Sequence, residues 1–174
     1  MRVFIGLPTP PEANAWILQN RPPLLPAAAR WLPVDTWHMT LCFIGEKTEE
    51  DVLKIHELVE PILQGHDYLS LRPTHIGWKG RTLWVHLDTC PILEKTVKRL
   101  HEALGMPFTG PFRPHITIAR ARIPLRWQGS WEVRPVRFTF TVGYLYQSIL
   151  RPEGAEYRPL YRYLFRYSPE WTVF

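Results

Sequence analysis

Two short segments place residues capable of chemistry at a spacing that suits β-strands. They are HMTL at residues 38–41 and HITI at residues 115–118. In a strand, residues i and i+2 point to the same face, so each segment presents an imidazole beside a hydroxyl group. The apolar residues that alternate with them would then face the core of the protein.

Two such strands placed opposite each other would line a cleft with His38, His115, Thr40 and Thr117. A neutral imidazole can take a proton from an attacking water or hydroxyl group, while a protonated one gives a proton to the leaving oxygen. The threonine hydroxyls can donate to the non-bridging oxygens of a phosphoryl group. The pattern therefore indicates phosphodiester chemistry that needs neither a metal nor another cofactor.

The elements around these segments predict an α+β protein with antiparallel sheets. Helices are expected from Thr9-Pro10-Pro11 to residue 20, over 48–63 with Thr48 as its N-cap, and over 91–104. Strands are expected at residues 2–7, 36–44, 69–78, 82–87, 114–121, 136–150 and 157–165. Residues 21–33 are expected to form a proline-rich loop with a helical turn at 27–30. Each half of the chain has its own His-x-Thr strand and helices, which suggests two related lobes.

Composition narrows the class of protein. The 174 residues are 45% hydrophobic, enough for one core, and 18 prolines argue against an all-helical bundle. The opening RVFIGL is soon interrupted by prolines, and no long apolar run follows. We therefore expect neither a signal peptide nor a membrane span, and a cytoplasmic location. Cys42 and Cys90 are too few for a disulfide framework and are expected to be buried thiols.

The positive charge is concentrated towards the end of the chain. The net charge is +5, and residues 113–174 contain ten arginines, no lysine and four glutamates. Arginine suits bidentate contact with phosphate or carboxylate groups, so an anionic partner is one interpretation. A solvated basic face is the other.

Four segments together resemble one known family. They are WHMTLCFIGE, IGWKGRTLWVHL, FRPHITIAR and LYQSILRPEGAEYRPLYRY, in that order along the chain. These segments resemble the LigT-like bacterial RNA 2',3'-cyclic phosphodiesterases, also described as 2'-5' RNA ligases, of the two-histidine (2H) phosphoesterase superfamily. The resemblance implies a single domain over residues 1–174, with two pseudo-symmetric lobes of antiparallel sheet, helices outside and a central active-site cleft.

The resemblance also implies an activity and roles for residues. RNA or oligonucleotide ends with a 2',3'-cyclic phosphate would be hydrolysed to 2'-phosphomonoesters, with His38 as proton donor and His115 as acceptor. The same pair run backwards would give weak 2'-5' ligation. Arg120 matches an arginine of the family and would clamp the phosphate, provided that a bulge or twist turns it to the face of His115. Arg113 departs from a histidine common in relatives, which leaves its role open. A monomer is expected.

Several assignments stay open from the sequence. Trp37, Phe43, Trp78 and Tyr146 are candidates for stacking on bases, although aromatic residues are more often part of the core. The other histidines show no zinc-ligand spacing, and His56 and His101 are expected on amphipathic helices, as exposed residues or at the boundary between the buried and exposed faces. Arg151, Arg158, Arg162 and Arg166 lie on the last hairpin and either follow an RNA backbone or face solvent. Two other functions stay open: a phosphodiesterase for small cyclic nucleotides or 2'-5' linkages, and a non-catalytic RNA-binding module.

Overall fold

The computed structural model describes residues 1–129 and 136–169. Its helices are α1 (Pro11–Asn20), α2 (Glu49–Leu63), α3 (Pro91–Ala103) and the short 3-10 helix η1 (Val34–Thr36). Its strands are β1 (Arg2–Pro8), β2 (Ala29–Trp31), β3 (His38–Glu46), β4 (Leu69–Leu71), β5 (Pro73–Lys79), β6 (Thr82–Leu87), β7 (His115–Ala121), β8 (Gln128–Gly129), β9 (Phe138–Phe140), β10 (Val142–Arg151) and β11 (Gly154–Leu164). None of the helices described is long and apolar enough to cross a membrane.

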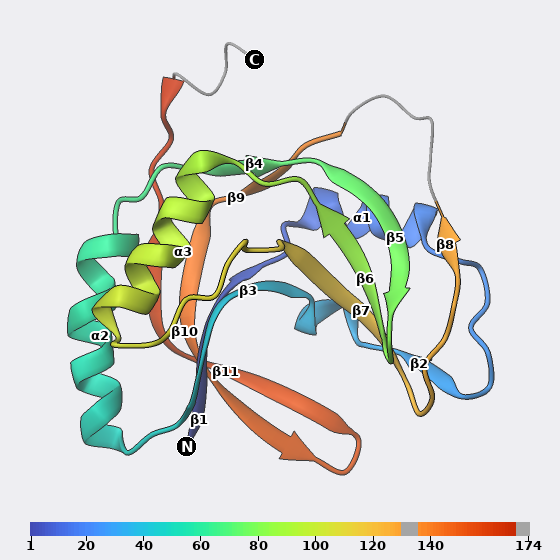
Figure 1. Ribbon diagram of the computed structural model, residues 1–174, viewed down its shortest axis with the longest axis horizontal. Helices are drawn as coiled ribbons and strands as arrows, with labels where there is room; N and C mark the ends of the chain where they lie inside the picture. The colour runs from blue at the N-terminus through green and yellow to red at the C-terminus, as the bar shows by residue number, and fades with distance from the viewer. Residues whose placement is uncertain (130–135, 170–174) are drawn as a thin grey trace.

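Two antiparallel sheets carry the two His-x-Thr segments. The four-stranded sheet has the order β11-β10-β1-β3, and the five-stranded sheet has the order β2-β7-β6-β5-β8. Strands β4 and β9 pair separately. In Figure 1, α2 and α3 lie side by side against the four-stranded sheet, whereas α1 lies on the side of the five-stranded sheet. The predicted α+β class with antiparallel sheets is confirmed.

Alternating side chains of the two motif strands build the core, as their period of two predicts. Met39 and Leu41 of β3, and Ile116 and Ile118 of β7, are at most 2% exposed. Burying such side chains contributes about 1.5–3 kcal/mol each, which fixes the register of both strands. The polar face of each strand is thereby turned away from the core.

Helix α2 begins as its sequence predicts. The Thr48 hydroxyl accepts a hydrogen bond from the Asp51 backbone N–H, and the Asp51 carboxylate accepts one from the Thr48 backbone N–H. This capping box satisfies two backbone donors that the first turn of a helix leaves unpaired. The helix then packs its apolar face against α3 and β11.

Three predicted elements were wrong in detail. Residues 29–31 form strand β2, which pairs with β7, and not the last part of a helical turn at 27–30. The strand predicted over 69–78 is interrupted at Arg72, so that β4 joins β9 while β5 joins β6. The strand predicted over 136–150 is interrupted at Thr141 between β9 and β10. In each case, pairing with a segment distant in the sequence decided the outcome.

Candidate active site

A cleft of about 570 Å³ lies between the two sheets. Strand β3, at the edge of the four-stranded sheet, lies next to β7 of the other sheet. All five residues predicted for the site line this one cleft: His38, Thr40, His115, Thr117 and Arg120. The structure therefore brings together side chains that are 77 residues apart in the two motifs.

The described lining of the cleft is cationic. Arg2, Arg30, Arg120 and Arg151 contribute to it, and no aspartate or glutamate does. Arg2 and Arg30 were missed by sequence reasoning, which placed the positive charge in the last third of the chain. Arg30 of β2 is paired in register with Arg120 of β7. Two neighbouring guanidinium groups without a lining carboxylate favour an anionic ligand.

Both motif histidines are held in the same way by their own strand. The Nδ1 atom of His38 lies 2.8 Å from the carbonyl oxygen of Thr36, and that of His115 lies 2.8 Å from the carbonyl oxygen of Arg113. Because a carbonyl can only accept, Nδ1 carries the hydrogen in both rings. Each neutral imidazole therefore has its lone pair on Nε2, the nitrogen available for proton transfer.

Aromatic side chains surround His38. Its ring centroid is 5.0 Å from that of Phe4 and 4.9 Å from that of Tyr157, which meets it edge-on. Its Nε2 lies 3.0 Å from the Thr40 hydroxyl oxygen. A Cβ atom at Gly6 would lie 3.2 Å from the His38 ring, which is a tight contact. The absence of a side chain at Gly6 therefore leaves room for the imidazole. Gly6, Phe4 and Tyr157 carry no local signal that sequence reasoning could use.

His115 has fewer neighbours. Its ring stacks on the indole of Trp84, with centroids 3.5 Å apart and planes 12° apart. Trp84 belongs to β6 and pairs in register with Thr117 of β7. The indole face can stabilise an imidazolium by a cation–π contact. Trp84 therefore fixes the orientation of the His115 ring.

A β-bulge turns Arg120 to the cleft, as the predicted role of this residue requires. The pairing of β6 with β7 shifts register so that Ile118 has no partner across the strands. Ile118 and Ala119 are consequently both buried, and Arg120 returns to the face of His115 and Thr117. Strand β3 has a similar shift at Leu41, which turns Phe43 to the cleft five residues after His38.

Burial sets the acid–base properties of both imidazoles. It is the largest cause that lowers the pKa of His38 below its ordinary value, and the positive charges of His115 and Arg120 lower that pKa further. The pKa of His115 is also lowered by burial. In both residues, the hydrogen bond from Nδ1 to a carbonyl opposes this shift, because it stabilises the charged ring.

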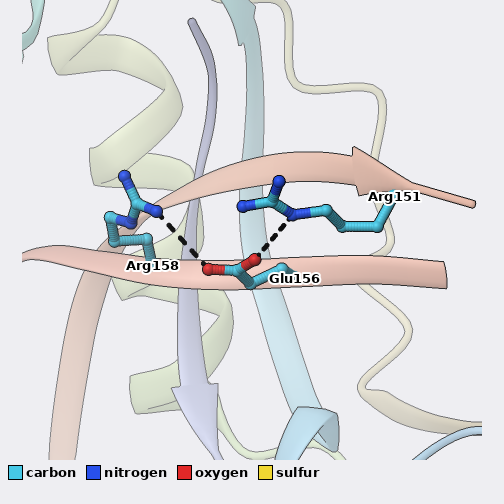
Figure 2. Close-up of polar contacts among 3 residues, drawn as sticks. All are labelled: Arg151, Glu156 and Arg158. Carbon is cyan, nitrogen blue, oxygen red and sulfur yellow. Dashed lines mark hydrogen bonds and ion pairs between the residues drawn. The ribbon is translucent and has the colours of Figure 1, made fainter. Parts of the chain in front are cut away.

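The β10–β11 hairpin closes one side of the cleft. Figure 2 shows Glu156 between two arginines, with its carboxylate oxygens 2.8 Å from Arg151 Nε and 3.5 Å from Arg158 Nη2. The tip of the hairpin is tied to the other sheet, since Arg30 Nη1 donates to the Glu153 carbonyl oxygen at 3.0 Å. Of the four hairpin arginines singled out in the sequence, Arg151 reaches the cleft.

Comparison with known proteins agrees with this architecture. No family model matches the chain. The RNA 2',3'-cyclic phosphodiesterase of Thermotoga maritima is 27% identical over 95% of this chain and 96% of its own length. Those of Thermus thermophilus and Escherichia coli are 29% and 27% identical over 95% and 93% of this chain.

Solved structures share the fold. Crystal structures of TT0787 of Thermus thermophilus and of Escherichia coli LigT with 3'-AMP superimpose with TM-scores of 0.77 and 0.71. Each covers 94% of this chain and 97% of its own, at 23% and 24% identity. This chain has the same fold as LigT. The resemblance carried by the four sequence segments is thus confirmed.

Most of the aromatic residues predicted as candidates for base stacking do not reach the cleft. Trp37 is buried, with its Nε1 donating to the Leu32 carbonyl oxygen, and Trp78 lines a separate hollow. Tyr146 packs beneath the site against Phe4. Only Phe43, 48% exposed, lies in the described lining of the cleft.

The remaining histidines and the two cysteines lie outside the described lining of the cleft. The boundary positions expected for His56 and His101 are confirmed: His56 stacks on Tyr161 and His101 is bonded to the Val97 carbonyl oxygen. Cys42 is buried and Cys90 is half-buried, and both are free thiols. Within residues 1–129 and 136–169, no group of three or more His, Cys, Asp or Glu side chains is arranged to hold a metal ion.

Proposed function

We propose that this protein hydrolyses the 2',3'-cyclic phosphate at the end of an RNA or oligonucleotide to a 2'-phosphomonoester. The observation that carries the proposal is a cationic cleft in which two imidazoles expose Nε2 beside Thr40, Thr117 and Arg120. The names of the relatives from three bacteria support the same reaction. A cytoplasmic location, a single domain and a monomeric state are parts of the proposal.

The reaction uses one imidazole as base and the other as acid. Neutral His115 takes a proton from a water molecule, whose oxygen attacks phosphorus, and the P–O3' bond breaks. Protonated His38 gives its Nε2 proton to the leaving O3', so the products are a 2'-phosphomonoester and a free 3'-hydroxyl. Thr40, Thr117 and Arg120 hold the non-bridging oxygens, whose negative charge they stabilise. These roles balance protons without any metal-bound water.

The bound phosphate prepares the acid for its role. In the free protein, burial and nearby positive charges lower the pKa of His38. An anionic phosphoryl group between the two rings has the opposite effect, because it favours the charged imidazolium. Substrate binding therefore raises the pKa of His38 and loads it with the proton that the leaving oxygen needs. Run in reverse, the same pair would join a cyclic phosphate to a hydroxyl group, which gives weak 2'-5' ligation.

The test is an oligoribonucleotide that ends in a 2',3'-cyclic phosphate, incubated with the protein in EDTA. We expect the wild type to form only the 2'-phosphate, and His38→Ala and His115→Ala to form almost none. His56→Gln, on α2 and outside the cleft, is the matched histidine control. Salt-sensitive RNA binding without turnover would show that the protein is an RNA-binding module and not an enzyme. Turnover of small cyclic nucleotides or 2'-5' linkages alone would change the substrate class.

A further inference from the structure

A row of histidines crosses three neighbouring strands next to the cleft. His115 of β7 pairs in register with His86 of β6, which pairs with His75 of β5. The rings of His75 and His86 are stacked, with centroids 3.9 Å apart and planes 12° apart. Trp84 connects this pair to His115, at 5.3 Å from His86 and 3.5 Å from His115. The row thus extends outwards from the proposed catalytic base.

The stacking decides what the row can bind. Because the rings of His75 and His86 face each other, their nitrogen-bearing edges, and not these faces, are available to a ligand. His75 Nδ1 is paired with the Thr74 hydroxyl at 3.0 Å, whereas neither ring nitrogen of His86 has a hydrogen-bond partner among the described residues. Parallel edges do not converge as metal ligands do. They offer a row of hydrogen-bonding groups to an extended polar ligand.

The charges around His86 specify the sign of that ligand. The charged and titratable groups that act on it are His75, His115, Lys79 and Arg113, all of them cationic or potentially so. Burial first and these charges next lower the pKa of His86 to about 4. The side chains of Lys79 and Arg113 are exposed and make no ion pair among the described residues. Such unneutralised positive charge favours an anion.

We propose that His75, His86 and Arg113 form a second phosphate subsite, which binds the internucleotide phosphate one nucleotide before the cyclic phosphate, while Lys79 adds only to the positive potential around it. The inference rests on the proposed function. Neighbouring strands are about 4.8 Å apart, so His86 and His75 lie about 5 and 10 Å from the line of His115. One nucleotide of an extended RNA strand spans such a distance. Arg113, whose role the sequence leaves open, becomes a substrate-binding residue.

The consequence is selection for substrate length. A nucleoside 2',3'-cyclic phosphate has no internucleotide phosphate, so it can use only the first site. A dinucleotide with a cyclic phosphate end uses both. A hydrogen bond to a charged group contributes about 1.5–3 kcal/mol, which corresponds to about tenfold or more in kcat/KM.

The experiment compares two dinucleotides that end in a 2',3'-cyclic phosphate and differ only in the linkage. One has the natural phosphodiester and the other an uncharged methylphosphonate. We expect the wild type to prefer the charged substrate about tenfold in kcat/KM, since only that substrate can form charge-assisted hydrogen bonds. In Arg113→Gln, which removes a charged contact, and in His86→Phe, which removes the ring nitrogens that can bond to the phosphate, this ratio should fall to within about twofold of unity. Arg99→Gln, an exposed arginine on α3, should keep the wild-type ratio.

The outcomes separate the two proposals. Turnover of both dinucleotides at equal rates by the wild type would overturn the second subsite and leave the proposed function intact. A preference that persists in both variants would place the phosphate elsewhere, for example at Arg30 or Arg151. Turnover of neither dinucleotide would overturn the proposed function itself.

Discussion

Strands β3 and β7 share a local geometry and differ in what surrounds it. Each holds its histidine through Nδ1 and a carbonyl two residues earlier, and each has a register shift that turns the fifth residue after the histidine to the cleft. That residue is Phe43 in β3 and Arg120 in β7. His38 is enclosed by aromatic rings, whereas His115 rests on one indole. The motif thus sets the direction of each imidazole, and the surrounding sheet sets how far each ring is enclosed.

The largest effect should come from the histidines themselves. We expect His38→Ala and His115→Ala each to lower kcat by about 10³-fold, because each removes one partner of a proton transfer. Binding of the 2'-phosphate product, measured by calorimetry, should stay within a few-fold of wild type. Because the two histidines serve one reaction as acid and base, the double variant should differ little from either single one. A variant that kept more than a tenth of wild-type activity would exclude that histidine from the chemistry.

The fifth position after each histidine should show the next largest effect. Arg120→Gln should lower kcat/KM by about 10²-fold, since it removes a charged donor to the developing phosphoryl charge. Phe43→Leu should raise KM by about fivefold with little change in kcat, because base stacking contributes about 1–3 kcal/mol and leucine retains only part of the contact. Arg122→Gln, exposed on the same strand end, is the control. Equal effects of the two substitutions would contradict the assignment of Phe43 to the base and of Arg120 to the phosphate.

The pH profile should reflect the lowered pKa values of both imidazoles. The active form has one protonated and one neutral ring, so its population is largest between the two pKa values, both below 6.5 in the free protein. We expect kcat/KM to peak below pH 6.5 and to fall about tenfold between pH 7 and pH 8. The profile of kcat should lie at higher pH, because bound phosphate raises both pKa values. Identical profiles for kcat and kcat/KM would argue against a phosphate bound between the rings.

The threonines should give smaller and unequal effects. Thr40→Val should lower kcat about tenfold, because Thr40 contacts His38 Nε2 and, in the proposed mechanism, also holds the phosphoryl group. Thr117→Val should lower it less, about threefold to fivefold, since among the described residues no hydrogen bond joins Thr117 to a histidine. Both variants keep the shape of the side chain, and single-turnover rates would compare them. A larger loss for Thr117→Val would reverse this assignment.

The smallest effect concerns the indole beneath His115. Trp84→Leu should lower the pKa of His115 by about 0.5 unit, since an exposed cation–π contact stabilises the imidazolium by about 0.5–1 kcal/mol. A histidine NMR titration of the free protein measures this shift directly. The pKa of His38, which does not contact Trp84, serves as the internal reference. A raised pKa of His115 would mean that burial by Trp84 outweighs the cation–π contact.

Local signals account for much of the fold and for the centre of the site. Period-two patterns predicted the faces of β3 and β7, the Thr48 capping signal predicted the start of α2, and the position of Arg120 required the bulge that the structure contains. Strand β2 could not be predicted, because its three residues owe their conformation to pairing with β7. Arg30 was missed with it. Arg2 and Gly6 were missed because only the pairing of β1 with β3 and β10 brings Arg2 to the cleft and Gly6 next to the His38 ring.

The arginine-lined cleft has a consequence for turnover. Hydrolysis converts a phosphodiester with one negative charge into a phosphomonoester that carries nearly two at neutral pH, by analogy with the second pKa near 6 of protein-bound phosphate. Four arginines and no lining carboxylate among the described residues will hold that product more strongly than the substrate. We therefore expect the product to bind more tightly than the substrate, and inorganic phosphate in the buffer to act as a competitive inhibitor.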